Sequence, residues 1–103
     1  MVSDETLKAR TARVLYRRGA YLPDWVAVDD VEAGILPVNW QHRVDAVNAI
    51  EGVALDQTSP VVFKPGTGRS AVALELGSRA DVNDRVKDWI ERHDPSELPF
   101  GLQ

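Results

Sequence analysis

The sequence contains no cysteine, and this absence excludes several kinds of stabilisation and chemistry. Without thiols the chain has no disulfide, no thiolate zinc site and no cysteine nucleophile. Its stability must come from a packed core, and a reducing compartment is favoured. Apolar residues make up 44% of the 103 positions, which is sufficient for one ordinary domain core. We expect a single domain over residues 1–103, with a tail at 95–103 that can be flexible.

Long apolar runs are also missing. No run approaches the ~18 residues that a membrane span requires. The first residues include Asp4 and Glu5 rather than a basic region followed by an apolar stretch, so no leader segment is expected. We therefore predict a cytoplasmic protein without membrane association.

Histidine is scarce, with only His42 and His93 available for general acid–base chemistry near neutral pH. They form no His-x-x-x-His or His-x-His pair, so we expect no metal site. His93 continues the apolar stripe of a predicted helix, where a packed or helix-ending imidazole accounts for it. No serine lies in a Gly-x-Ser-x-Gly elbow. The sequence therefore favours a non-catalytic protein over an enzyme, and we expect no catalytic residue and no cofactor.

Within the turn-rich residues 64–70, a glycine-rich motif over residues 66–71 matches the letters of a dinucleotide-binding fingerprint, and residues 66–70 are similar to the end of a phosphate loop. Such a loop must open a helix, whereas this segment runs into an alternating strand pattern. Phe63 also stands where a phosphate loop requires glycine. We interpret the segment as a hairpin turn. A weak anion site remains as the alternative, and it would use Lys64, Gly66, Gly68 and Arg69.

Capping residues predict two well-defined helices. Ser3 and Gly19 are suited to begin and end a helix over about residues 4–18. Near the other end, Ser78 and Asp81 have capping-box spacing before a helix over about residues 82–93. The apolar stripe of this second helix contains Val82, Val86, Trp89 and Ile90.

The middle of the chain is less regular. Asn39 and Gly52 predict a helix over about residues 40–51 with one face in the core. Residues 61–63 and 71–76 predict a β-hairpin. Residues 23–33 fit either a strand or a helix that ends at Gly34, and we favour the strand. These elements predict an α+β fold, a small domain of about three helices on a short, mostly antiparallel sheet with one β-hairpin.

Charge is unevenly distributed along the chain. Residues 1–20 carry five basic side chains against two acidic ones, a net +3, whereas residues 21–103 carry seven against fourteen, a net −7. Opposite potentials of this kind steer and orient association. At 3.6 residues per turn, Arg10, Arg13 and Arg17 align on one flank of the first predicted helix. We predict that these three arginines form an interaction surface for a protein partner or a second copy.

These features favour a non-catalytic interaction or assembly module, such as an accessory subunit, an antitoxin-like or immunity-like inhibitor, or a small phage structural component. The first alternative is a nucleic-acid-binding protein that uses the basic first helix, although a net charge of −4 disfavours nucleic acid as the main partner. The second is a small enzyme or ligand-binding protein with a site at an oligomer interface, where His93, Asp94 and residues 64–70 are the candidates.

Overall fold

Both serine-capped helices form, and they lie side by side. The computed structural model describes residues 2–35, 43–66 and 70–103. Ser3 Oγ accepts a hydrogen bond from the Thr6 amide at 3.2 Å, and Ser78 Oγ accepts one from the Asp81 amide at the same distance. The elements, in chain order, are α1 (Asp4–Arg18), β1 (Val26–Ala27), α2 (Val28–Ile35), α3 (Arg43–Leu55), β2 (Val61–Phe63), β3 (Ala71–Leu74), α4 (Arg79–His93), and the 3-10 helices η2 (Pro95–Glu97) and η3 (Phe100–Leu102).

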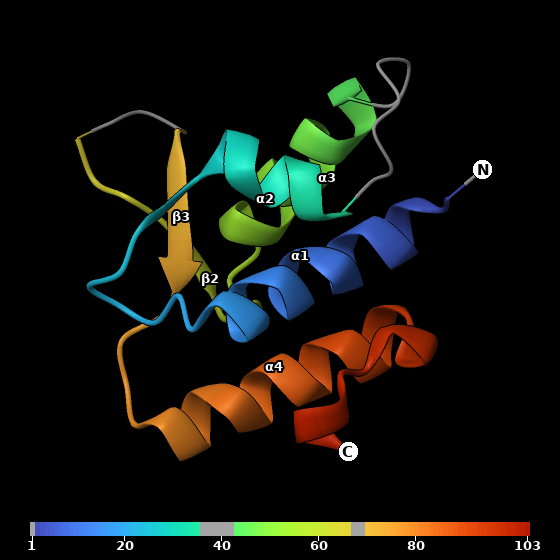
Figure 1. Ribbon diagram of the computed structural model, residues 1–103, viewed down its shortest axis with the longest axis vertical. Helices are drawn as coiled ribbons and strands as arrows, with labels where there is room; N and C mark the ends of the chain where they lie inside the picture. The colour runs from blue at the N-terminus through green and yellow to red at the C-terminus, as the bar shows by residue number, and fades with distance from the viewer. Residues whose placement is uncertain (1, 36–42, 67–69) are drawn as a thin grey trace.

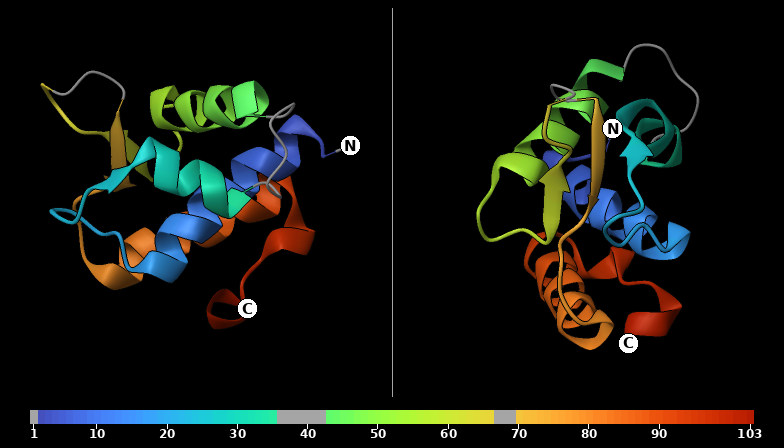
Figure 2. Two further views of the ribbon diagram at one scale, coloured as in Figure 1. Left: turned by 45° about the horizontal axis from the view of Figure 1, so that its top comes forward. Right: turned by 90° about the vertical axis from the view of Figure 1, so that its left-hand side faces the viewer.

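Helix α1 occupies the centre of the fold. It packs against α4 on one side and against α2 and α3 on the other, with the small sheet at one end of the helices (Figures 1 and 2). Gly19 ends α1 with a φ of 65°, in the left-handed region that glycine adopts without steric cost. The predicted α+β class is confirmed, with four α-helices rather than three in the described residues.

The sheet has the strand order β1-β3-β2, and both neighbouring pairs are antiparallel. Val72 of β3 lies opposite Val26 of β1 and Phe63 of β2, which confirms the predicted hairpin. Strand β3 ends at Leu74, two residues before the predicted end, because the chain then leaves the sheet toward α4. Leu76 is consequently 83% exposed.

The strand that we favoured for residues 23–33 is limited to Val26–Ala27, and the helical alternative is correct from Val28 onward. The two-residue strand β1 is followed directly by α2, whose first turn holds Asp29 and Asp30. These carboxylates are favourable there because the amino end of a helix carries a partial positive charge. Gly34 does not end α2 as expected. A Cβ at Gly34 would lie 3.0 Å from Val14 Cγ2, so this glycine allows α2 to approach α1 closely.

Helix α3 corrects two expectations. The Asn39 cap and Trp40 lie outside the described residues, and Gly52 lies inside the helix, which continues to Leu55. The helical spacing of Val44, Val47 and Ile50 predicts that these residues face the core, but Val44 is 68% exposed, so the buried stripe is rotated. Small side chains of α3, rather than Val44, are buried at the contact with neighbouring helices. The buried residues of α3 are Ala46, Ala49, Ile50 and Val53.

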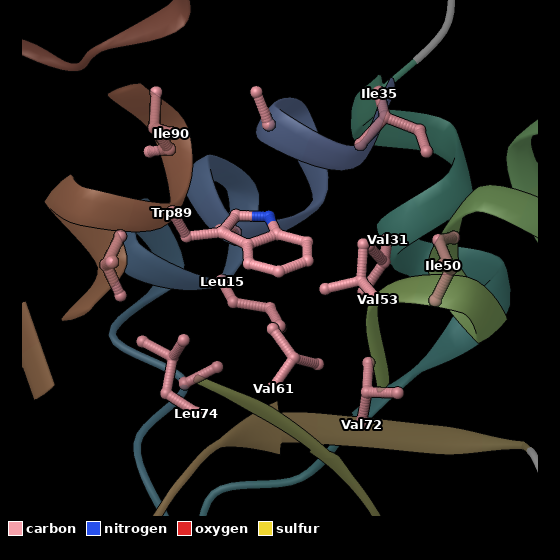
Figure 3. Packing of buried hydrophobic residues seen from close by; sticks show 14 of the residues in the cluster. Leu15, Val31, Ile35, Ile50, Val53, Val61, Val72, Leu74, Trp89 and Ile90 are labelled. Carbon is pink, nitrogen blue, oxygen red and sulfur yellow. The ribbon is translucent and has the colours of Figure 1, made fainter. Parts of the chain in front are cut away.

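One continuous core joins all four helices to the sheet (Figure 3). Trp89 of α4 is 1% exposed, and its ring extends among Leu15, Val31 and Val53, which come from three different helices. The indole Nε1 donates a hydrogen bond to the Lys8 carbonyl at 3.1 Å, so its polar atom is satisfied. This confirms the expectation that Trp89 belongs to the core. None of the helices in the described ranges is long and apolar enough to cross a membrane.

The segment after α4 forms η2 and η3, and Glu97, Pro99 and Leu102 are buried in it. Asp94 begins η2, since one of its carboxylate oxygens accepts hydrogen bonds from the Ser96 amide and hydroxyl at 3.1 and 2.6 Å. The other oxygen accepts one from the Thr6 hydroxyl at 2.5 Å, which links this segment to α1. Flexibility of the tail stays a prediction.

The Asp94 contacts predict an acid-sensitive contribution to stability. The hydrogen bonds from Ser96 and then Thr6 lower the pKa of Asp94 below its usual value. A lowered pKa in the folded state gives stability that is present above the unfolded value of about 4 and is lost as pH falls further. We expect Asp94→Asn to reduce the dependence of the urea midpoint on pH between about pH 5 and pH 2. Parallel curves for the two proteins would contradict this prediction.

Candidate functional site

Glu97 of η2 binds two of the three arginines that the sequence singled out. Its carboxylate accepts a hydrogen bond from Arg10 Nε at 2.9 Å and another from an Nη atom of Arg13. Arg10 also donates to the Ile35 carbonyl at 3.1 Å. The Glu97 side chain is only 10% exposed, so this contact, which we call the Glu97 clasp, lies mostly below the surface. The structure thus pairs Arg10 and Arg13 within the protein.

Arg17 lies apart from the Glu97 clasp. It is exposed in the last turn of α1, where the helix end meets the start of α4. The three predicted arginines therefore do not form one free row, although they share a flank of the helix. Arg17 instead lines a surface hollow with a volume of about 560 Å³.

We call this feature the arginine hollow. The hollow is lined by the end of α1, by Gly19 and Tyr21 after it, and by the first turns of α4; Figure 1 shows these two helix ends as neighbours. The lining residues are Tyr16, Arg17, Arg18, Gly19, Tyr21, Arg79 and Asn83.

Aromatic stacking holds Arg79 in the hollow. Its guanidinium carbon lies 4.3 Å from the centroid of the Tyr21 ring, within the range of a cation–π contact. The Tyr21 hydroxyl donates to Asn83 Oδ1, which fixes the ring. Burial raises the pKa of Tyr21, and the positive charge of Arg79 opposes that shift. Tyr21 therefore remains a neutral hydrogen-bond donor at physiological pH.

The charges in the hollow are not balanced locally. Elsewhere the described arginines contact carboxylates, as Arg43 does with Glu32 at 2.8 Å and Arg92 with Asp88 at 3.4 Å. Within residues 2–35, 43–66 and 70–103, no carboxylate forms an ion pair with the arginines of the hollow. These are Arg17, Arg18 and Arg79. An anion that entered the hollow would meet guanidinium groups that no described acid occupies.

The position of Arg79 reinforces this imbalance. It is the first residue of α4, where the helix dipole disfavours a positive charge. The sequence interpretation used this segment only for its capping spacing and did not single out Arg79, Tyr21 or Asn83. A basic residue at the start of a well-capped helix was the one available signal, because the first turn of such a helix usually holds acids.

The second predicted anion site is only partly described. Gly68 and Arg69 lie outside the described residues. The Lys64 amide donates to the Ala71 carbonyl at 3.0 Å, which continues the pairing of β2 and β3, and Gly66 has a φ of 81° that suits a turn. These contacts agree with the interpretation of a hairpin turn.

The candidate histidine is held by contacts within the protein. The His93 ring lies 4.0 Å from the Trp89 ring, and its Nδ1 forms a hydrogen bond with Glu5. His42 lies outside the described residues. In the part of the chain that the structure describes, no three side chains of the usual metal-ligating kinds gather into a site.

Comparison of the chain with protein-family models, with curated proteins and with solved structures gives no significant match in any of the three. No relative therefore supplies an activity, a partner or a site residue for this chain. The arginine hollow and the Glu97 clasp are the features from which a function can be inferred.

Proposed function

We propose that this chain is a non-catalytic protein-binding module and that the arginine hollow binds an acidic segment of a partner protein. The main supporting observation is the lack of any described carboxylate partner for Arg17, Arg18 and Arg79. A guanidinium group presents its donors in a planar fork that matches a carboxylate, so arginine is well suited to bind aspartate and glutamate.

The local charge of the hollow supports an acidic partner over a basic one. The chain as a whole carries a formal net charge of −4, which does not favour acidic molecules. The hollow is an exception, because its lining includes three arginines and no acidic residue. Such a local potential steers an acidic segment to one place and orients it there. Tyrosine and arginine are also enriched at the centres of protein interfaces.

Selection from a displayed library of short random peptides tests this proposal without a known partner. We expect the peptides that bind the native protein to be enriched in aspartate and glutamate. For the best peptide, Arg17→Glu with Arg18→Glu should weaken binding at least about tenfold, because each charge-assisted hydrogen bond contributes about 1.5–3 kcal/mol. Isothermal titration calorimetry measures this change.

One lysine and one arginine of α4 provide a matched control. Lys87→Glu with Arg92→Glu changes the net charge by the same amount but lies outside the hollow. This control should bind the selected peptide with nearly unchanged affinity. Equal losses of affinity in the two double variants would mean that net charge alone explains the effect, and this would contradict the proposal. A selected pool of peptides without acidic enrichment would also contradict it.

Nucleic acid is the competing ligand for the same arginines. The row of Arg10, Arg13 and Arg17 is not wholly free, because the Glu97 clasp engages the first two. Titration with a mixed-sequence DNA duplex distinguishes the two ligands. Tight, steeply salt-dependent DNA binding that requires Arg17 and Arg18, together with no selected acidic peptide, would favour phosphate as the ligand and overturn the protein-binding proposal.

A further inference from the structure

Phe100 is the most exposed large apolar residue in the described chain. Its side chain is 91% exposed, although the neighbouring residues Pro99 and Leu102 are buried. The 3-10 helix η3 therefore holds an aromatic ring in solvent on a segment whose adjacent residues are anchored in the protein. Exposure of a phenylalanine forgoes the burial of a large apolar surface, so packing within the chain does not account for this residue.

The residue after Phe100 contacts a residue that lines the arginine hollow. Gly101, the following residue, is packed against the hydroxyl of Tyr16, and a side chain at Gly101 would overlap that hydroxyl. Tyr16 in turn lines the hollow. Figure 2 shows η3 beside α4, against which it packs. One residue thus separates Phe100 from a contact with the rim of the hollow.

We propose that the docking surface for the partner includes both the arginine hollow and Phe100, and that Phe100 is its apolar anchor. The partner segment then carries an aromatic or aliphatic side chain close to its acidic residues, with the acids in the hollow and the apolar side chain on Phe100. This inference rests on the proposed function, since it specifies the partner that the hollow binds.

The combination of groups matches the chemistry of strong interfaces. Most binding energy at protein interfaces comes from a few aromatic and arginine residues near the centre, which other contacts shield from water. Pro99 and Leu102 are buried on either side of Phe100, and such flanking contacts reduce the entropy that the segment loses on binding. Of the other exposed large apolar residues in the described chain, Val44 and Leu55 lie on α3, and Leu76 lies between β3 and α4; none of them lines the hollow.

Paired variants of the protein and of a selected peptide test the anchor. Among peptides selected on the native protein, we expect an apolar residue near the acidic ones in most sequences. Phe100→Ala should weaken the best peptide at least about tenfold, the usual size of a hot-spot effect. In the Phe100→Ala variant, replacing the apolar residue of the peptide by serine should cause little further loss of affinity, because the effects of changing two groups in direct contact are not additive.

Several controls separate failure of the anchor from failure of the hollow. Leu55→Ala removes an exposed apolar side chain outside the hollow and should leave the affinity unchanged. Phe100→Tyr keeps the ring and should retain most of the binding. Unchanged affinity in Phe100→Ala, together with a large loss in Arg17→Glu with Arg18→Glu, would overturn the anchor and leave the proposed function intact.

The remaining outcomes are equally decisive. No acidic enrichment in the selected peptides would overturn both proposals. A native protein with twice the monomer mass in solution, converted to a monomer by Phe100→Ala, would mean that a second copy covers the aromatic ring. That result would overturn the inference of a separate partner segment.

Discussion

Replacement of Trp89 by alanine is expected to lower the free energy of unfolding by about 3–5 kcal/mol. The ring is 1% exposed and lies among side chains from several helices, so its removal leaves a cavity as well as losing apolar contacts (Figure 3). It also leaves the Lys8 carbonyl without the indole donor. Urea unfolding followed by circular dichroism measures the loss.

Trp25 offers a comparison within the same chain. It is only half-buried, and Trp25→Ala should therefore cost less than Trp89→Ala. A loss below about 1 kcal/mol for Trp89→Ala would contradict the packing described for α4, because a fully buried aromatic ring cannot be removed at so small a cost.

The second large effect is expected at the Glu97 clasp. Glu97→Ala should lower the free energy of unfolding by about 2–4 kcal/mol, because removal of one member of a buried ion pair leaves the other charges uncompensated. The side chains of Arg10 and Arg13 are 24% and 23% exposed, so water can solvate them only in part. Arg13 Nε is already buried without a hydrogen-bond partner in the described residues.

Arg17→Glu is the matched control for the clasp, and it should change stability by no more than about 0.5 kcal/mol because Arg17 is exposed. Thermal or urea unfolding of Arg10→Glu with Arg13→Glu should show severe destabilisation, since two new carboxylates would face Glu97. Full stability of both Glu97→Ala and this double variant would mean that the pairing is dispensable. Arg10 and Arg13 would then be free to act beside Arg17 as the sequence predicted.

Local signals predicted much of the helical structure. Ser3, Gly19 and Ser78 have side chains or backbone freedom that satisfy the unpaired groups at helix ends, and these effects need no information about distant residues. The boundaries of α1 and the hairpin of β2 and β3 were therefore predictable. The burial of Trp89 followed from the apolar stripe of α4.

Tertiary contacts decided the features that the sequence did not reveal. Gly52 was predicted to end a helix, and Gly34 was the end of the helical alternative for residues 23–33, but each lies within a helix. At Gly34 the close contact with Val14 explains the choice, and at Gly52 the nearest surrounding atom is Lys8 Cε at 3.8 Å. The buried stripe of α3 uses alanines, whose small size gives little signal in a search for large apolar residues.

Ion pairs between residues that are far apart in the sequence also cannot be predicted from local spacing. Arg13 and Glu97 are separated by 84 positions, so no helical spacing connects them. For the same reason the sequence placed Arg10, Arg13 and Arg17 in one group, whereas the fold assigns two of them to the clasp and the third to the hollow. Arg79 joins Arg17 only because α4 begins where α1 ends.

The Glu97 clasp has a consequence for the order of events during synthesis on the ribosome. Helix α1 emerges well before α4 and η2, yet its arginines are neutralised by a residue that is translated more than 80 positions later. Until then Arg10 and Arg13 lack the acidic partner that the folded protein gives them, and the apolar residues of this segment lack their α4 neighbour. Contacts of such long sequence separation slow folding. The clasp can therefore close only after Glu97 has left the ribosome.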